Sequence, residues 1–363
     1  MEIRRRSTIF RLLLSACLFL LLMKVSLVLV EPLCRIMGRK CNVVKEETGY
    51  DDYDLFLMTK KEAERFDLQQ IHKLLNGDFH FNTTKINDIK SQISKVSNPS
   101  MLFASRGNMA NAKRIKFALE EVPIRKIPSD MFNFLPHEQH LSFGRPTVCS
   151  VVGSSGILNN SSCGRQIDNA DFVIRFNLPP LNGHRKDVGS RSDITTLNPS
   201  QIGKQFGGFV FFKDRQRFLK HVQQYNHYIW ASAFAHPNTM ETCRRLLITT
   251  RSRLKHLKIL FGNPNHWRSM STFWHTRGVN VKKHLSSGIY WVTNALSFCS
   301  EVHLYGFWPF ALNWADQPVR YHYYANEWPT TGSSKTHGFG DEFYALLQMH
   351  KQGILQIHTN CDS

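Results

Sequence analysis

The sequence has few acidic residues, no C-x-x-C pair, no internal repeat and no low-complexity tract. The shortage of acid leaves 46 Lys and Arg against 28 Asp and Glu, a formal net charge of +18 at pH 7. Without a C-x-x-C pair, the eight cysteines favour disulfide bonds over a zinc site. The absence of repeats excludes a repeat architecture, so the apolar segments are expected to form one large domain.

The N-terminal region has the pattern of a membrane anchor. Residues 12–30 are apolar apart from Ser15, Lys24 and Ser26, and about 20 apolar residues span a bilayer. Residues 1–11 carry four arginines and one acid, which predicts a cytoplasmic tail and a luminal remainder. We therefore predict a transmembrane signal anchor in a single-pass type II protein. A cleaved signal peptide is the alternative, although no small-residue cleavage site is evident.

The remainder of the chain changes composition near residue 100. Residues 31–100 are polar and predict a luminal stem, whereas residues 101–363 contain apolar and aromatic segments at the density of one domain. A luminal location agrees with disulfide-bonded cysteines. It also agrees with the glycosylation sequons at Asn82, Asn159 and Asn160.

The domain predicts an α/β fold with a mostly parallel sheet flanked by helices, because short apolar segments alternate with helical ones. Strands are expected at 149–152, 171–177, 227–234, 257–261 and 301–308. Helices are expected at 218–225, 287–299 and 341–354.

The positive charge is concentrated in residues 244–284, which hold ten Lys or Arg and no Asp or Glu. Such a segment can bind nucleic acid, membrane headgroups or small anions, or simply form a solvated surface. No recognised nucleic-acid-binding module appears, and nucleic acid is not expected in the secretory lumen. We therefore predict no nucleic-acid partner and favour an anionic glycan, a nucleotide sugar or a lipid headgroup.

A glycine-rich turn, GSSG at 153–156, follows the first expected strand. At the carboxyl end of a parallel strand, such a turn lets backbone N–H groups approach a phosphate. The pattern is weak by itself, because it is not GxGxxG and no Walker lysine follows; a plain tight turn is the alternative.

Four segments resemble the motifs of animal sialyltransferases. The large motif is matched at 149–181 by CSVVGSSGILNNSSCGRQIDNADFVIRFNLPPL, and the small motif at 286–310 by SSGIYWVTNALSFCSEVHLYGFWPF. The third is matched at 321–324 by YHYY, and the very small motif at 337–343 by HGFGDEF. The GFWPF segment, the HYY triplet and a cysteine near the C-terminus resemble the alpha-2,8 branch.

The resemblance implies a Rossmann-like sialyltransferase fold and an inverting, metal-independent enzyme of the Golgi. The expected reaction transfers sialic acid from CMP-sialic acid to the 8-hydroxyl of a terminal sialic acid on a glycolipid or glycoprotein, as in ganglioside biosynthesis. CMP-sialic acid is a co-substrate of this reaction, and no cofactor is expected. The residues implied to bind CMP-sialic acid are Ser154, Asn177, Ser286, Ser287, Gly288, Gly306, Phe307, Trp308, Tyr321 and His322.

The implied chemistry assigns roles to three titratable residues. Negative charge grows on the phosphate as CMP leaves, and without a metal a donating or cationic imidazole can meet it; His322 fits this role. The acceptor hydroxyl must lose a proton, and an imidazole suits that task at neutral pH; His337 fits. Glu342 is expected to orient His337 or to act at a helix end.

The alpha-2,8 branch further implies disulfide bonds between Cys149 and Cys299 and between Cys163 and Cys361. By spacing alone, Cys149 could instead pair with Cys163. A stem cysteine could link two chains into a homo-oligomer. The other luminal cysteines receive no partner, and of these Cys243 is expected to be a buried thiol; they are Cys34, Cys41 and Cys243.

The chain departs from the usual alpha-2,8 motifs at several positions: Ser154, Phe176, Ser287, Ala325 and Gly340. None of these removes a proton-transfer residue. They leave room for a non-catalytic relative that binds sialylated glycans. Polysialic acid synthesis is a further alternative, suggested by the basic segment, but residues 261–283 resemble the mono- and oligosialylating members more closely.

Overall fold

The computed structural model describes residues 66–109, 115–119, 126–137, 146–251, 253–254, 256–280, 283–329 and 337–361. The predicted cytoplasmic tail, the signal anchor at 12–30, the stem cysteines and residues 31–65 of the predicted stem lie outside these ranges. Within them, no helix combines the length and the apolar composition that crossing a bilayer requires.

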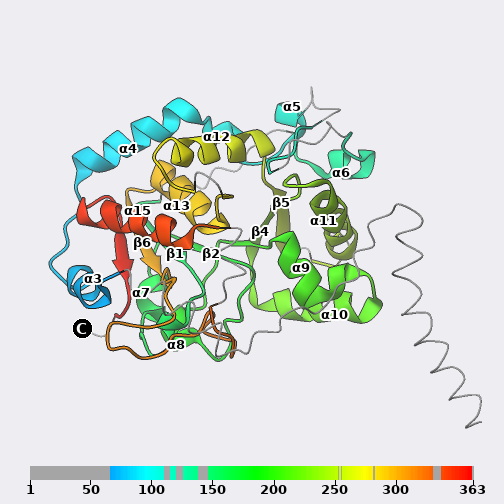
Figure 1. Cartoon of the computed structure of the whole chain (residues 1–363). Helices are drawn as coiled ribbons and strands as arrows, with labels where there is room; N and C mark the ends of the chain where they lie inside the picture. Colours follow the sequence, from blue (N-terminus) through cyan, green and yellow to red (C-terminus); the bar gives the residue numbers. More distant parts are fainter. Residues whose placement is uncertain are drawn as a thin grey trace, which may run out of the picture. The chain divides into compact units, whose positions relative to one another are not determined.

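A seven-stranded, fully parallel sheet with the order β5-β4-β3-β2-β1-β6-β7 forms the centre of the fold (Figure 1). This confirms the predicted α/β class. The strands are β1 (Val148–Val152), β2 (Phe172–Arg175), β3 (Ile194–Thr196), β4 (His227–Ala231), β5 (Leu257–Phe261), β6 (Glu301–Tyr305) and β7 (Gln356–His358).

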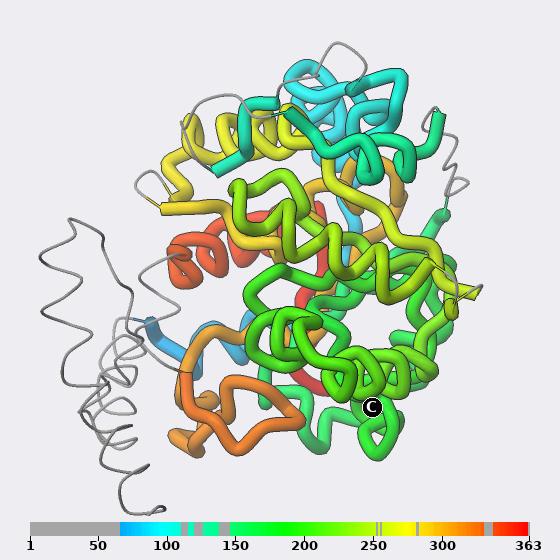
Figure 2. The backbone as a smooth tube through the Cα atoms, turned by 90° about the vertical axis from the view of Figure 1, so that its right-hand side faces the viewer, coloured from blue at the N-terminus to red at the C-terminus, as the bar shows by residue number. Residues whose placement is uncertain are grey.

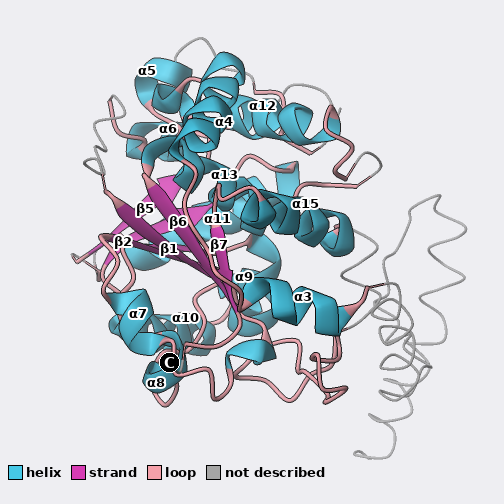
Figure 3. Ribbon diagram, turned by 90° about the vertical axis from the view of Figure 1, so that its left-hand side faces the viewer, coloured by secondary structure: helices cyan, strands magenta, loops and turns pink. Residues whose placement is uncertain are grey.

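Helices cover both faces of the sheet, as Figure 3 shows. The α-helices are α3 (Leu68–Leu75), α4 (Thr83–Val96), α5 (Arg106–Met109), α6 (Ser129–Phe134), α7 (Gly164–Asp168), α8 (Arg185–Val188), α9 (Pro199–Phe206), α10 (Phe212–His221), α11 (Pro237–Thr250), α12 (Pro264–His275), α13 (Ser287–Phe298) and α15 (Phe339–Lys351). The short 3₁₀ helices are η1 (Pro99–Met101), η2 (Gly156–Leu158), η3 (Gly207–Phe209) and η4 (Val222–Gln224).

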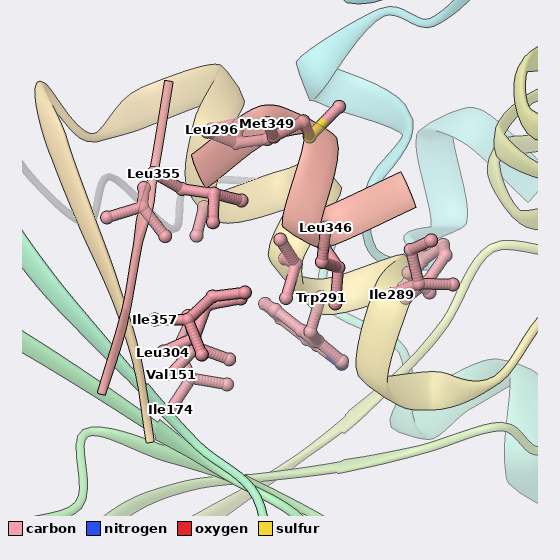
Figure 4. Close-up of a cluster of buried hydrophobic side chains, with 14 of the residues drawn as sticks. Val151, Ile174, Ile289, Trp291, Leu296, Leu304, Leu346, Met349, Leu355 and Ile357 are labelled. Atoms are coloured by element: carbon pink, nitrogen blue, oxygen red, sulfur yellow. The ribbon is translucent and has the colours of Figure 1, made fainter. Parts of the chain in front are cut away.

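The buried side chains form two clusters, one on each face of the sheet. Helices α3, α4, α12, α13 and α15 contribute to the first cluster, and α7, α9, α10 and α11 to the second. Alternate strand residues point to opposite faces, so Val151 belongs to the first cluster and Val152 to the second. In Figure 4, Val151 and Leu304 of the sheet face Trp291 of α13 and Leu346 of α15.

The helix α13 is the central helix of the first cluster. Ser286 caps its N-terminus, because the hydroxyl oxygen accepts a hydrogen bond from the Ile289 N–H at 3.2 Å. Every side chain from residue 289 to residue 296 is buried, so this helix is buried on all sides rather than amphipathic. Its N-terminus is thereby held at a fixed place beside the carboxyl edge of the sheet.

Residues assigned to the stem are part of this fold. Helices α3 and α4 precede residue 101, yet Leu68, Ile89 and Ile93 lie in the first core cluster. The folded domain thus begins upstream of the boundary expected at residue 101. The prediction placed the boundary too late because both helices are amphipathic and contain few apolar residues. Their overall composition is therefore that of a polar stem, although their apolar faces pack on the core.

Two strands had no counterpart in the sequence analysis. The strands β3 and β7 have three residues each, too short to produce a recognisable apolar run. Three expected strands are also shorter than predicted: 171–177 is reduced to Phe172–Arg175, 227–234 ends at Ala231 and 301–308 ends at Tyr305. Residues 306–329, within the orange part of Figure 2, form a long connection without helix or strand.

The structure contains both disulfide bonds that the resemblance implied, Cys149 with Cys299 and Cys163 with Cys361. They close loops with sequence separations of 150 and 198 residues. The alternative pairing of Cys149 with Cys163 is therefore wrong. Cys243 is a free, fully buried thiol, as expected, and burial raises its pKa.

Candidate active site

The order of the strands reverses between β1 and β6. Strands β1 to β5 follow one another in one direction, whereas β6 and β7 lie on the other side of β1. Ligands of open parallel sheets bind outside the carboxyl ends of the strands at such a switch point. Gly153 and Ser154 follow β1, and Gly306 and Phe307 follow β6. The fold thus places three of the expected CMP-sialic acid-binding residues at the switch point.

The two strand ends meet through backbone alone. The Gly153 N–H donates to the Tyr305 carbonyl at 2.7 Å, and the Ser155 N–H donates to the Gly306 carbonyl at 3.3 Å. A Cβ on Gly153 would lie 2.4 Å from the Gly306 oxygen, and Gly306 has a φ of +67°. Neither position can carry a side chain without moving the backbone. The two turns at the switch point are consequently in direct main-chain contact.

The YHYY segment is attached to the turn after β1. The Gly156 N–H donates to the Arg320 carbonyl at 3.0 Å, and the Tyr323 N–H donates to the Ser154 carbonyl at 2.9 Å. The second bond brings His322 next to the switch point, although 168 positions separate it from Ser154 in the sequence (322 minus 154).

The His322 imidazole lies between tyrosines. Its ring is nearly parallel to that of Tyr324, with centroids 5.0 Å apart, and lies 4.3 Å from that of Tyr321. Burial, with a smaller contribution from the charge of Lys204, lowers the pKa of His322 to about 4. At neutral pH the imidazole is therefore uncharged and can donate one hydrogen bond. A bound anion beside it would raise this pKa.

Asn177 connects β2 to the helix start that carries Ser287. Its side-chain oxygen accepts a hydrogen bond from the Asn198 N–H at 3.0 Å, and its own N–H donates to Thr196 Oγ1 at 3.0 Å. The Asn198 amide in turn donates to Ser287 Oγ at 3.3 Å. The large and small motifs are thus joined through Asn198, which sequence reasoning missed because it follows the unrecognised strand β3.

His337 lies at the other side of the α13 N-terminus. Its Nδ1 is 2.8 Å from the His284 carbonyl oxygen. A carbonyl can only accept, so Nδ1 carries the proton and the lone pair of the neutral ring is on Nε2. Burial is the main cause that lowers the pKa of His337. The ring is therefore neutral at pH 7, with Nε2 able to accept a proton.

Glu342 is buried, with 4% of its surface exposed. Its carboxylate accepts hydrogen bonds from the Ser286 N–H at 2.9 Å, from the Ser286 hydroxyl at 2.5 Å and from the Asn280 amide. Burial raises the pKa of Glu342 to about 7. Within the described part of the chain it makes no hydrogen bond to His337, so of its two expected roles the structure favours the one at a helix end.

Asn280 connects Glu342 to the two backbone groups next to the His337 ring, the Gly338 N–H and the His284 carbonyl. Its side-chain oxygen accepts from the Gly338 N–H at 2.9 Å, and its amide also lies 3.5 Å from the His284 carbonyl that His337 contacts. Asn280 is 1% exposed. It thereby contacts the backbone of Gly338 and of His284, on either side of the imidazole, and we expect it to position the His337 ring.

We expect Asn280→Ala to lower kcat for transfer on the order of ten- to a hundredfold, since a misplacement of about 1 Å costs that much. The KM for CMP-sialic acid should change little, and the acid limb of the pH profile should move because the environment of His337 changes. Asn238→Ala, at an exposed position of α11, is the matched control. An unchanged kcat and pH profile in a folded Asn280→Ala variant would contradict the positioning role.

Two further residues expected to bind CMP-sialic acid, Trp308 and Gly288, differ in how far their side chains or backbone are accessible. Trp308 is 4% exposed, its indole N–H donates to the Leu312 carbonyl at 2.8 Å, and its ring packs on Phe310 and Phe343. Only its backbone remains for CMP-sialic acid. Gly288 faces the Phe307 ring, which a Cβ would approach to 3.4 Å.

Comparison with known proteins agrees with the motifs. Residues 89–354 match the family Glycosyltransferase family 29 (sialyltransferase). The chain belongs to this sialyltransferase family. The match begins upstream of residue 101, in agreement with the position of α4 in the core.

Several sialyltransferases are similar to the chain. Alpha-N-acetylneuraminide alpha-2,8-sialyltransferase of Bos taurus is 39% identical over 77% of this chain and 77% of its own length. Alpha-2,8-sialyltransferase 8E of Homo sapiens is 32% identical over 82% and 78%. The crystal structure of a mammalian sialyltransferase in complex with Gal-beta-1-3GalNAc-ortho-nitrophenol has a TM-score of 0.42 and 18% identity over 89% of this chain and 99% of that chain.

Two further expectations concern the glycosylation sequons and the absence of a metal site. The sequon residues Asn82, Asn159 and Asn160 are exposed, and Asn82 also caps α4. In the ranges that the structure describes, no group of three or more His, Cys, Asp or Glu side chains could hold a metal ion.

Proposed function

We propose that this sialyltransferase transfers sialic acid from CMP-sialic acid, with inversion, to the 8-hydroxyl of a terminal sialic acid on a glycolipid or glycoprotein. It adds one or a few residues. Support for the linkage comes from the names of the relatives, which are alpha-2,8-sialyltransferases. The observation that carries the catalytic assignment is the His337 Nδ1 contact with the His284 carbonyl.

The proposed base acts on the acceptor. His337 Nε2 takes the proton of the attacking 8-hydroxyl while the oxygen forms a bond to the anomeric carbon and the bond to the CMP phosphate breaks. The low pKa of His337 keeps the imidazole neutral before the reaction, and the Nδ1 hydrogen bond to a carbonyl stabilises the imidazolium that forms.

The phosphate is proposed to lie between the glycine turns and His322. Negative charge grows on it as CMP departs, and pre-oriented donors around that charge lower the barrier. The neutral His322 ring supplies one donor, and the increase of charge on the phosphate raises its pKa toward proton transfer. Ser154, Asn177 and Ser287 are proposed to bind the nucleotide side. Among these, the Ser287 hydroxyl is held by Asn198.

The cellular setting is part of the proposal. The apolar segment 12–30 would anchor the chain in the Golgi membrane with the catalytic domain in the lumen. The cysteines of the stem could join two chains into a homo-oligomer. Anchoring and disulfide formation both agree with a luminal enzyme that contains two long-range disulfide bonds.

Removal of divalent metal should leave transfer intact. We expect activity to persist in saturating EDTA, because His322 and main-chain N–H groups are proposed to meet the charge on the departing CMP. Initial rates with and without EDTA measure this. Complete loss on chelation, reversed by Mn²⁺ or Mg²⁺, would contradict the mechanism.

The function is tested by incubating the protein with CMP-sialic acid and a panel of alpha-2,3- and alpha-2,6-sialylated glycolipids and glycoproteins, followed by linkage determination of the products. Alpha-2,8-linked products of one or a few added residues are expected. Long polymers would identify a polysialic acid synthase. Binding of sialylated glycans without product would identify a non-catalytic relative, the alternative that Ser154 and Ala325 allow.

A further inference from the structure

The described residues expose few large apolar side chains, and half of them are consecutive. Val210, Phe211 and Phe212 are 53%, 63% and 68% exposed, and the other three such residues are Val96, Ile248 and Tyr344. We call residues 210–212 the apolar tip. Adjacent exposed aromatic residues are unusual on a soluble surface and typically mark a site of contact with a protein or a membrane.

The apolar tip is held outward by a defined turn. Gly207, Gly208 and Phe209 have φ values of +52°, +63° and +59°, which reverse the chain after α9. Phe209 then packs on Phe218, with centroids 4.9 Å apart, in the core. The Arg215 guanidinium donates to the Phe209 carbonyl at 2.9 Å. The buried Phe209 and the bonded turn leave the next three side chains in solvent.

Basic residues surround the tip. Residues 204–220 contain five Lys or Arg, and their single acid, Asp214, is buried and paired with Arg217 at 3.1 Å. Arg245 of α11 donates to the Gly208 carbonyl at 3.4 Å, and the exposed Ile248 lies three residues further along the same helix, on the same side. The surface therefore combines exposed apolar side chains with excess positive charge.

We propose that this surface is where the folded domain contacts the lipid bilayer, with the apolar tip entering the region between headgroups and acyl chains. Lys213 then lies beside anionic headgroups, and so do Arg217 and Arg245, each of which also contacts a carboxylate, that of Asp214 and that of Glu241 respectively. Apolar and aromatic residues flanked by Lys and Arg are the composition of interfacial membrane contacts. A second copy of the chain fits less well, because a symmetric contact would place the same cations against each other.

The position of the tip relative to the candidate active site suggests what the membrane contact would do for the reaction. Asn198 occupies the N-cap position of α9 and donates to Ser287, and the tip follows the other end of the same helix. Eight helical residues rise about 12 Å, the scale of a short oligosaccharide. A bilayer at the tip would thus present the headgroup of a membrane glycolipid near the site, a consequence that rests on the proposed function. In Figure 1, α9, α10 and α11 lie together on one side of the sheet, away from α15.

The contact is tested by site-specific quenching in the full chain. Phe212→Trp is reconstituted in liposomes of phosphatidylcholine brominated on its acyl chains, with phosphatidylserine added, and the emission of the unsubstituted chain is subtracted. Tyr344→Trp, at a position of α15 that is 55% exposed, is the matched control. We expect a loss of emission at residue 212 and none at residue 344. No quenching at 212, or equal quenching at both positions, would overturn the proposal.

Two further experiments test the basic residues and the apolar tip separately. Quenching at 212 should weaken when phosphatidylserine is omitted; equal quenching would overturn the role of the basic residues. The variant Phe211→Ser with Phe212→Ser should transfer less to a sialylated glycolipid in liposomes while retaining transfer to a soluble sialylated oligosaccharide. Equal loss on both acceptors would contradict a membrane role. Quenching requires no acceptor, so its outcome is independent of the proposed function.

Discussion

His337→Ala is expected to abolish transfer while leaving CMP binding largely intact. Loss of a proton-transfer group typically costs on the order of a hundredfold or more in rate. The ring is hydrogen-bonded to the His284 carbonyl and is proposed to act on the acceptor, so its removal should leave the glycine turns and His322 in place. Turnover under saturating substrates and CMP binding by calorimetry measure the two effects.

Two other variants test this assignment by contrast. His322→Ala should weaken CMP binding and also lower turnover, because that ring is proposed to contact the phosphate. His256→Ala, at an exposed position before β5, should leave both unchanged. A folded His337→Ala protein with near-normal turnover would remove His337 as the base.

The pH dependence gives an independent readout of the same base. The active form of His337 is the neutral one, and burial lowers its pKa below the usual 6.5. Activity should therefore persist as the pH falls through 6.5 and disappear only at lower pH, where the ring becomes protonated. An acid limb centred above 6.5 would contradict the assignment of this half-buried imidazole.

Removal of the Cys163–Cys361 disulfide is expected to destabilise the domain severely. In the chain-entropy model a closed loop of this length contributes about 5 kcal/mol, and the sequence separation is 198 residues. The free energy of unfolding of a whole domain is about 5–15 kcal/mol. The double variant Cys163→Ser with Cys361→Ser should thus lose a large part of its stability and its activity.

The matched control for cysteine removal is Cys243→Ala, which deletes the free buried thiol. It should lose much less stability, since only a small apolar contact disappears. Denaturant midpoints of the secreted domain under oxidising conditions provide the comparison. Equal destabilisation by both changes would show that the disulfide contributes little beyond packing.

The loss of the other disulfide should affect the elements that carry the site. Cys149 lies near the start of β1, at the end opposite the glycine turn, and Cys299 follows α13 at the end opposite Ser286. Their bond links the strand of the large motif to the helix of the small motif. The stability that it contributes therefore acts on the same two elements that position the candidate site.

Local sequence was sufficient for the features that depend on local composition. The apolar runs and glycine turn predicted the parallel α/β sheet, and the four motifs predicted the family and both disulfide pairs. It was insufficient for the short strand β3 and for α4, whose few apolar residues acquire meaning only against a core. Asn198 and Asn280 were missed for a related reason: an asparagine in a polar stretch has no local signal of its partners.

The sequence by itself determined the family and the fold class, and it singled out the two histidines of the proposed mechanism, because motif residues and hydrophobic periodicity are properties of the chain. Only the tertiary structure decided that Glu342 contacts Asn280 and Ser286 and that a carbonyl holds the proton on His337 Nδ1. It also decided that residues 210–212 are exposed while Phe209 is buried. Each of these depends on which groups meet across the folded chain, since hydrogen bonds and burial involve residues far apart in sequence.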